Sequence, residues 1–264
     1  MAGTSTSPPL VHSLNVLPAW QRIDLIADLH LQASEPHTFE AWANFMQNTQ
    51  ADAVFILGDL FEVWVGDDAV PSDPFLQQCL QVMQSAAQQR AVFFMHGNRD
   101  FLISDALLAQ HGVTLLPDPS CLHWGPNRWL LSHGDALCLD DTDYQVFRTT
   151  CRAAQWQHDF LSRPLHARQA LARQMRQDSR AHQAQQTHYA DPDTILSLQW
   201  LSACQAHTLI HGHTHRPADH HLDNGHRRIV LSDWSLDHEP QRAQVLRVNV
   251  NGAHQRLTPS QACA

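Results

Sequence analysis

Val54-Phe55-Ile56-Leu57-Gly58-Asp59 is the stretch that sets the interpretation of the whole chain. A short apolar run with β-branched and aromatic members is typical of a strand buried on both faces. A carboxylate at the end of such a strand is costly unless positive charge meets it. Asp59 could cap the following turn, or it could be the shared ligand of two metal ions ~3.5–4 Å apart. Taken alone, the stretch favours the turn cap.

Four further apolar runs with the same pattern favour the metal hypothesis. Residues 23–27 precede Asp28 and His30, residues 92–95 precede Asn98, residues 129–132 precede His133, and residues 208–210 precede His213 and His215. In open α/β sheets, functional sites gather at the carboxyl ends of the strands. We therefore expect these side chains to meet at one edge, an arrangement that core packing alone would not produce.

The alternation of strand-like and helix-like segments predicts the α/β class. Strands are expected near 22–27, 54–58, 92–95, 113–116, 128–132, 207–211, 227–232 and 243–249, and helices at about 36–50, from 74 onward and near 104–110. Residues 1–20 are rich in Ser, Thr and Pro, which indicates a flexible N-terminal extension. Residues 21–264 are expected to form a single domain with a helical insertion at about 140–200.

Composition limits the classes of partner. The formal charge is −9, which disfavours nucleic acid, and nothing in the sequence indicates a protein partner. The six cysteines form no CxxC pair, so we expect reduced thiols in a cytosolic protein. There is no signal-peptide pattern, and no apolar stretch reaches the ~20 residues of a spanning helix. Any contact with a membrane would be peripheral.

The side chains at the predicted edge share one coordination chemistry. They offer carboxylate, amide and imidazole ligands but no thiolate: Asp28, His30, Asp59, Asn98, His133, His213 and His215. This mixture suits manganese, iron or zinc better than calcium or a structural zinc. Asp-x-His and His-x-His fit such a site because alternate residues of an extended chain point the same way.

In this order, Asp-x-His, Gly-Asp, Gly-Asn, His-Gly and Gly-His-x-His resemble the calcineurin-like metallophosphoesterases, over roughly residues 23–217. The resemblance implies two packed sheets flanked by helices. It also implies two divalent metal ions. One would be held by Asp28, His30, Asp59 and His215, and the other by Asp59, Asn98, His133 and His213.

Longer strings resemble a narrower family, the UDP-2,3-diacylglucosamine diphosphatases of lipid A synthesis. They are Asp-Leu-His-Leu at 28–31, Gly-Asp-Leu-Phe-Glu at 58–62, His-Gly-Asn-Arg-Asp-Phe-Leu at 96–102, Asp-Asp-x-x-Tyr at 140–144, Met-Arg-x-x-Ser at 175–179 and His-Gly-His-Thr-His-Arg-Pro at 211–217. The resemblance implies cleavage of an acylated UDP-sugar into UMP and the sugar 1-phosphate. It further implies manganese, and a peripheral location on the cytoplasmic face of the inner membrane.

Arg99 supports the narrower resemblance on chemical grounds. Many phosphoesterases of the broad family carry His after Gly-Asn, as a general acid for an alkoxide leaving group. The leaving group of a pyrophosphate is itself a phosphate, with a second pKa near ~6, and it can depart unprotonated at neutral pH. An arginine that neutralises developing charge is then more useful than an acid.

The resemblance also implies the remaining site roles. Asn98, Arg99 and His213 would be catalytic, and substrate would be held by Asn98, Arg99, Asp141, Tyr144, Ser179, Gln183, Gln186 and His213. The family typically has Asn and Lys at the positions of Gln183 and Gln186. Gln183 can still form hydrogen bonds, but Gln186 supplies no charge, which affects the expected contacts with the lipid sugar rather than the metal site.

The helical region 140–205 is locally basic, with seven arginines between 148 and 180. An anionic partner and an ordinary solvated helix face explain this equally well. Its apolar residues could hold acyl chains or dock the helices onto the core.

Two other functions remain as alternatives. A metallophosphoesterase acting on another nucleotide or phosphodiester would predict His rather than Arg99. A non-catalytic scaffold that kept the fold would be expected to lose metal ligands, and all seven are present. We interpret the chain as a two-metal hydrolase of a phosphoanhydride.

Overall fold

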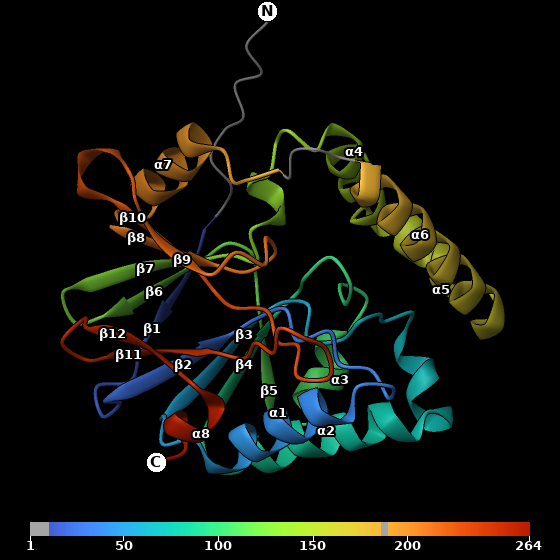
Figure 1. Cartoon of the computed structure of the whole chain (residues 1–264), viewed down its shortest axis with the longest axis horizontal. Helices are drawn as coiled ribbons and strands as arrows, with labels where there is room; N and C mark the ends of the chain where they lie inside the picture. Colours follow the sequence, from blue (N-terminus) through green and yellow to red (C-terminus); the bar gives the residue numbers. More distant parts are fainter. Residues whose placement is uncertain (1–10, 186–189) are drawn as a thin grey trace, which may run out of the picture.

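The computed structural model describes the backbone of residues 11–185 and 190–264 and the side chains of residues 11–176 and 190–264. Two six-stranded sheets pack face to face, and helices cover their outer faces (Figure 1). The predicted α/β class and the two-sheet sandwich are confirmed.

The first sheet has the order β12-β11-β2-β3-β4-β5, with bounds His254–Leu257, Val245–Asn249, Arg22–Ile26, Ala53–Leu57, Ala91–Met95 and Val113–Leu116. The second has the order β1-β6-β7-β8-β10-β9, with bounds His12–Asn15, Ser120–Trp124, Asn127–Leu131, Thr208–His211, Arg227–Val230 and Ala218–His221. Strands β2 to β5 run parallel in the first sheet, and β7, β8 and β10 run parallel in the second.

Strand β3 is buried along its whole length, as its sequence predicts. Val54 and Ile56 face the helical layer, whereas Phe55 and Leu57 belong to the cluster between the sheets. Both faces of the strand are therefore apolar, which explains why its sequence does not alternate between polar and apolar residues.

The helices fall into three groups. Helices α1 (Pro36–Asn48), α2 (Pro74–Ala87), α3 (Asp105–Gln110) and α8 (Pro259–Ala262) pack on the outer face of the first sheet. Helix α7 (Thr194–Ala203) covers the second sheet. Helices α4 (Thr142–Cys151), α5 (Ala154–Leu161) and α6 (Leu165–Gln185) lie to one side of the sandwich (Figure 1). Of the helical region predicted at 140–200, only α4 to α6 lie outside the sandwich layers.

Residues 11–20 differ from their prediction, and residues 1–10 lie outside the described part of the chain. We expected a flexible extension over residues 1–20, but β1 pairs in parallel with β6, and Val16 is buried in the cluster between the sheets. The strand is short, mostly exposed and at a sheet edge, so it has no apolar run that would reveal it. Strands β6, β9 and β12 were not predicted either: β9 and β12 are mostly polar, and the five residues of β6 include Ser120 and His123, so none of the three is an unbroken apolar run.

A buried ion pair joins β2 to β11. Asp24 and Arg247 face each other in the register, with Nε 2.8 Å from Oδ1 and Nη2 2.8 Å from Oδ2. Arg247 also donates to the Ala262 carbonyl at 2.7 Å, which ties the last helix to the sheet. Asp24 is fully buried and Arg247 is 4% exposed.

We expect Arg247→Met to lower the free energy of unfolding by ~3–5 kcal/mol, because it leaves the Asp24 carboxylate buried without its cation. Urea unfolding measures this loss. Arg227→Met, at an exposed position on β10, is the control and should stay within ~0.5 kcal/mol of the wild type. A loss below ~1 kcal/mol for Arg247→Met would mean that water reaches the pair.

Candidate active site

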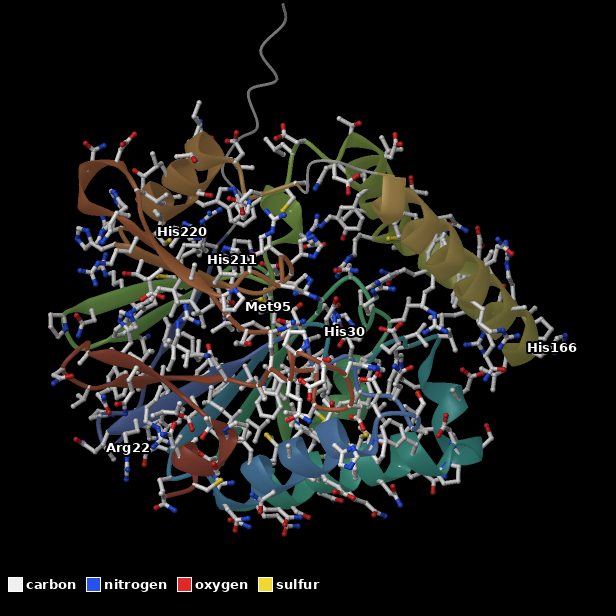
Figure 2. All side chains as sticks on the ribbon, in the orientation of Figure 1. Arg22, His30, Met95, His166, His211 and His220 are labelled. Atoms are coloured by element: carbon white, nitrogen blue, oxygen red, sulfur yellow. The ribbon has the colours of Figure 1, made fainter. Side chains whose placement is uncertain are left out.

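Five loops that follow β2, β3, β4, β7 and β8 meet where the carboxyl ends of the two sheets come together. His30, just past β2, lies near the middle of the molecule, whereas Arg22, at the start of the same strand, lies at the periphery (Figure 2). The predicted residues are therefore brought to one edge of the sandwich.

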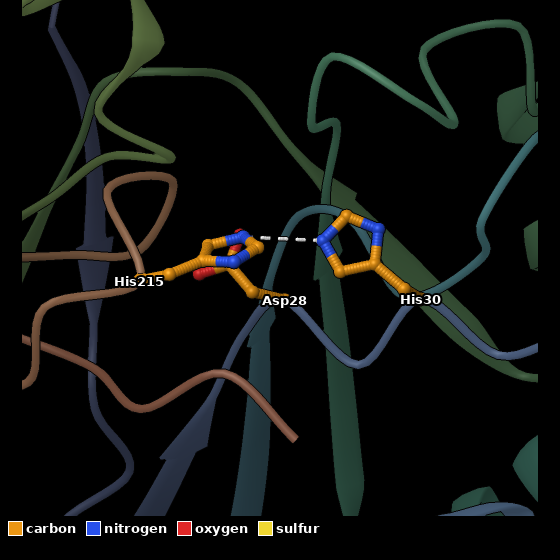
Figure 3. A group of neighbouring side chains, drawn as sticks. All are labelled: Asp28, His30 and His215. Atoms are coloured by element: carbon orange, nitrogen blue, oxygen red, sulfur yellow. Dashed lines mark hydrogen bonds and ion pairs between the residues drawn. The ribbon is translucent and has the colours of Figure 1, made fainter. Parts of the chain in front are cut away.

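Asp28, His30 and His215 form the first group (Figure 3). The Nε2 atoms of His30 and His215 are 3.2 Å apart, and Nε2 of His215 lies 3.6 Å from Oδ1 of Asp28. Oδ1 of Asp28 is buried and has no hydrogen-bond partner among the described residues, while Oδ2 accepts from the His213 amide at 2.8 Å. One carboxylate oxygen and two ring nitrogens thus converge on one point.

Asn98, His133 and His213 form the second group. Oδ1 of Asn98 lies 3.0 Å from Nε2 of His133 and 3.0 Å from Nδ1 of His213. Nδ1 of His133 donates to the Leu57 carbonyl at 2.9 Å. Nδ1 of His133 therefore carries a proton, and Nε2 is the ring atom that faces the amide oxygen.

Asp59 lies between the two groups. Its Oδ2 is 3.8 Å from Nε2 of His30, and its Oδ1 is 3.8 Å from Nε2 of His133. Each oxygen therefore faces a different group, which is the arrangement that a shared ligand requires. Asp28 also lies within reach of Asp59 and His133, a proximity to the second group that the sequence did not indicate.

The backbone of this edge is strained at the predicted residues. Among the described residues, seven other than glycine have a positive φ, and five of them are predicted ligands: Asp28, His30, Asp59, His213 and His215, at 56°, 49°, 51°, 66° and 52°. Strain of this kind persists only where the surroundings enforce it, and it concentrates at functional sites. Gly97 is required nearby, because a Cβ there would come within 2.1 Å of Oδ1 of Asp59.

The donor set fits divalent metal ions. Ring nitrogens and an amide oxygen that face one another at 3.0–3.2 Å, and a buried carboxylate oxygen without a hydrogen-bond partner among the described residues, form a donor set that a divalent cation placed among them would satisfy. All seven predicted residues are linked through such contacts, from Asp28 to His213. Their individual roles as ligands stay predictions.

The electrostatics of the site favour ionised carboxylates and a charged His133: burial alone would lower the pKa of His133, but the carboxylates of Asp59, Asp135 and Asp28 raise it to about 9. Burial alone would raise the pKa of the Asp28 carboxyl, but the imidazoles of His215, His133 and His30 hold it well below its usual range. Burial and the neighbouring charge of His133 lower the pKa of His213 to about 4. His213 is therefore neutral at neutral pH, so its ring can offer a lone pair.

Two buried carboxylates support the site and were not predicted to do so. Asp100 accepts from the amides of Gly97 at 2.8 Å and of Leu60 at 2.7 Å, so it joins the Asn98 loop to the Asp59 loop. Glu62 receives Nδ1–H of His30 at 3.1 Å. Burial would raise the pKa of the Glu62 carboxyl, but His30, Arg99 and Arg176 lower it to about 2, so Glu62 is ionised.

Two of the predicted substrate residues, Asp141 and Tyr144, make hydrogen bonds within the protein. Asp141 caps α4 by accepting from the Tyr144 amide at 3.1 Å, and the Tyr144 hydroxyl donates to the buried carboxylate of Asp135. The Tyr144 ring nonetheless lies beside His213, with centroids 5.8 Å apart. Ser179 and Gln183 lie on α6 with side chains outside the described part, and Gln186 lies outside the described residues.

Four arginines of the basic helical region make contacts within the protein. Arg148 pairs with Asp135 at 2.8 Å, Arg152 donates to the Gly97 carbonyl at 2.8 Å, Arg168 bonds Asp68 and the Val65 carbonyl, and Arg176 donates to Glu62 at 3.1 Å. Neither an anionic partner nor a simple solvated face accounts for these four residues. They dock the helices onto the loops of the site.

His96 and His211 lie near the site, and each makes a contact with the backbone. His211 is buried, and burial lowers its pKa to about 3. Nε2 of His96 donates to the Ile103 carbonyl at 2.8 Å. His166 is exposed and lies far from His30, at the outside of the molecule (Figure 2).

In the described part of the chain, no helix is both long enough and apolar enough to cross a membrane.

The family model for calcineurin-like phosphoesterases matches residues 21–217. Three relatives carry the name UDP-2,3-diacylglucosamine hydrolase. The protein of Shewanella halifaxensis is 41% identical over 79% of this chain and 88% of its own length. That of Chromobacterium violaceum is 43% identical over 80% and 90%, and that of Bordetella parapertussis is 39% identical over 89% and 93%.

Proposed function

Because the chain belongs to the calcineurin-like phosphoesterases, we propose that this site hydrolyses the pyrophosphate of UDP-2,3-diacylglucosamine. The products are UMP and 2,3-diacylglucosamine 1-phosphate. The observation that carries this proposal is the match to hydrolases of that name over 79–89% of the chain. The family model covers residues 21–217, which include the site and the helices beside it. Arg99, in place of a histidine, supports a phosphate leaving group.

Two divalent ions would occupy the two groups of donors. Asp28, His30, Asp59 and His215 would hold one ion, and Asp59, Asn98, His133 and His213 the other. Imidazole and carboxylate donors without thiolate suit Mn²⁺, which is the ion we propose. When bound, such a pair supplies positive charge at the reacting phosphate and lowers the pKa of the attacking water.

The side chains of the site then bind and orient the substrate. Water attacks one phosphorus, the bond from that phosphorus to the bridging oxygen breaks, and the water proton passes to solvent. The backbone N–H of Arg99 donates to Oδ1 of Asp59 at 2.8 Å. The buried Nε of the Arg99 side chain has no hydrogen-bond partner among the described residues. The guanidinium can therefore donate to the phosphates, where charge builds up during transfer.

The docked helices supply the contacts with the rest of the substrate. Asp141 and Tyr144, together with Ser179, Gln183 and Gln186, would hold the sugar and its phosphate. Phe160 belongs to the buried core cluster, and Trp156, Leu165 and Leu171 pack against that cluster. Part of the apolar surface of these helices therefore docks them onto the core. Phe147 and Met175 are half-buried and are available to acyl chains.

We further propose that the protein meets its substrate at the cytoplasmic face of the inner membrane as a peripheral protein. A sugar with two acyl chains stays in the bilayer, because each CH₂ that enters water costs ~0.8 kcal/mol. Val146 on α4 is 69% exposed and Leu161 on α5 is 40% exposed. Both apolar side chains lie on the helices that dock beside the site.

Release of UMP from the acylated UDP-sugar in the presence of Mn²⁺ tests the function. The expected result is turnover of this substrate and little turnover of UDP-N-acetylglucosamine, which has the same pyrophosphate but lacks the acyl chains. Preferred hydrolysis of UDP-N-acetylglucosamine or of a simple phosphodiester would favour the alternative of another substrate for the same fold. A chelator such as EDTA should abolish the activity, and Mn²⁺ should restore it.

A further inference from the structure

Glu62 joins the predicted metal site to the helices beside the sandwich. It lies in the loop after β3 and is 7% exposed. One carboxylate oxygen, Oε2, is 3.1 Å from Nδ1 of His30, and the other, Oε1, receives Nη1 of Arg176 at 3.1 Å. The two oxygens of the Glu62 carboxylate thus accept from different residues, one from the metal site and one from α6.

The contact with His30 decides which atom that ring presents to the site. The carboxylate requires the proton of His30 on Nδ1, so the lone pair is on Nε2, which faces His215 and Asp59. Carboxylates that receive the second ring nitrogen of a metal-binding histidine orient the ring and increase its basicity. Glu62 stands in this relation to His30.

The contact with Arg176 holds the carboxylate itself. A Glu side chain has several rotatable bonds, and a single hydrogen bond leaves it free to turn. Arg176 comes from α6, 114 residues further along the chain. Eight residues earlier on the same helix, Arg168 is 2% exposed and bonds Asp68 and the Val65 carbonyl, in the loop that also carries Glu62. Helix α6 is therefore fixed to this loop at two points, about two turns apart.

We propose that Arg176 is a positioning residue for the metal site, acting through Glu62 on His30. Docking of α6, which carries predicted substrate contacts, is thereby coupled to the affinity of the first metal position. The inference rests on the proposed two-metal centre. It concerns metal affinity in the absence of substrate, and it is therefore independent of which substrate is cleaved.

Titration calorimetry of the metal-free full-length protein with Mn²⁺ tests the proposal. Glu62→Gln should weaken Mn²⁺ binding by ~10–100-fold, the range seen when such a partner of a metal ligand is lost. Arg176→Met should weaken it by ~10-fold, and Arg176→Lys should restore part of that loss. The double variant should bind no more weakly than Glu62→Gln, because both substitutions interrupt the same chain of contacts.

Arg173→Met is the matched control, since Arg173 is exposed on the same helix one turn away. It should leave the Kd for Mn²⁺ unchanged. Circular dichroism and Tm of each variant report on folding. Glu62→Gln decides the role of Glu62 even if Arg176→Met loosens α6, because it leaves Arg168 and Arg176 in place.

Four outcomes would overturn the inference. An unchanged Kd for Mn²⁺ with a raised KM in Arg176→Met would make Arg176 a substrate contact only. Additive losses in the double variant would show that Arg176 and Glu62 act separately. If the wild-type protein binds no Mn²⁺, the proposed two-metal centre fails together with the inference, whereas normal Mn²⁺ binding with unaffected variants overturns the inference alone.

Discussion

Asp59→Ala is expected to lose bound metal at both positions and to lower kcat by at least ~10³-fold. The reason is geometric, because its two oxygens face His30 and His133 at 3.8 Å each. Removing the carboxylate takes one ligand from each group and leaves two closely spaced cations without the charge between them. Several kcal/mol of transition-state stabilisation depend on such ions, and each 1.36 kcal/mol corresponds to a factor of ~10 in rate.

Elemental analysis of the purified Asp59→Ala variant, combined with the UMP-release assay, measures both effects. Asp52→Ala is the control, because Asp52 lies at the opposite end of β3 and accepts from the amides of Gln21 and Arg22 at 2.6 and 2.9 Å. It should retain metal and activity. Two ions still bound in folded Asp59→Ala would show that Asp59 does not bridge.

The carboxyl-edge arrangement could be predicted because each element of it is local in sequence. An apolar run followed within a few residues by Asp, Asn or His gives both the strand and the side chain at its end. The parallel order of β2, β3 and β4, and of β7 and β8, then places those ends together. The positive φ values of Asp28 and His213 are consistent with the tight turns that these short loops require.

The supporting residues could not be predicted because their partners are distant in sequence. Glu62 and Asp100 both lie in the strings that resemble the family, but a string does not show that Glu62 meets Arg176 or that Asp100 receives the amide of Leu60. A signal was present, since both carboxylates follow apolar strands within a few residues. Only the fold reveals that they are buried and which groups they bind.

The basic helical region also shows that contacts between residues distant in sequence cannot be predicted from local composition. Local composition left an anionic partner and a solvated face equally favoured. The structure instead pairs Arg148 with Asp135 and Arg168 with Asp68. These acids lie 13 and 100 residues away from their arginines in sequence. Charge counted in a window of sequence cannot anticipate neutralisation by residues outside that window.

Arg99→Ala is expected to lower kcat by at least ~10²-fold while both metal positions stay occupied. One preorganised donor that stabilises transition-state charge contributes a factor of this size. The main chain of Arg99 should be unaffected, because its amide still donates to Asp59 Oδ1 and its carbonyl still accepts from the Trp64 amide at 2.9 Å. The loss should therefore appear in the chemical step and leave metal content unchanged.

The nature of the leaving group gives a sharper test of Arg99. In Arg99→His, kcat on the pyrophosphate substrate should fall by a similar factor, because an imidazole that is mostly neutral at neutral pH does not supply the permanent positive charge that the departing phosphate needs. On a phosphodiester with an alkoxide leaving group, the same variant should lose less, since protonation then assists departure. Parallel measurements of kcat for both substrates, with metal content determined for each preparation, decide the question. Near-normal kcat for Arg99→Ala on the pyrophosphate would mean that the charge developing during transfer is neutralised elsewhere in the site.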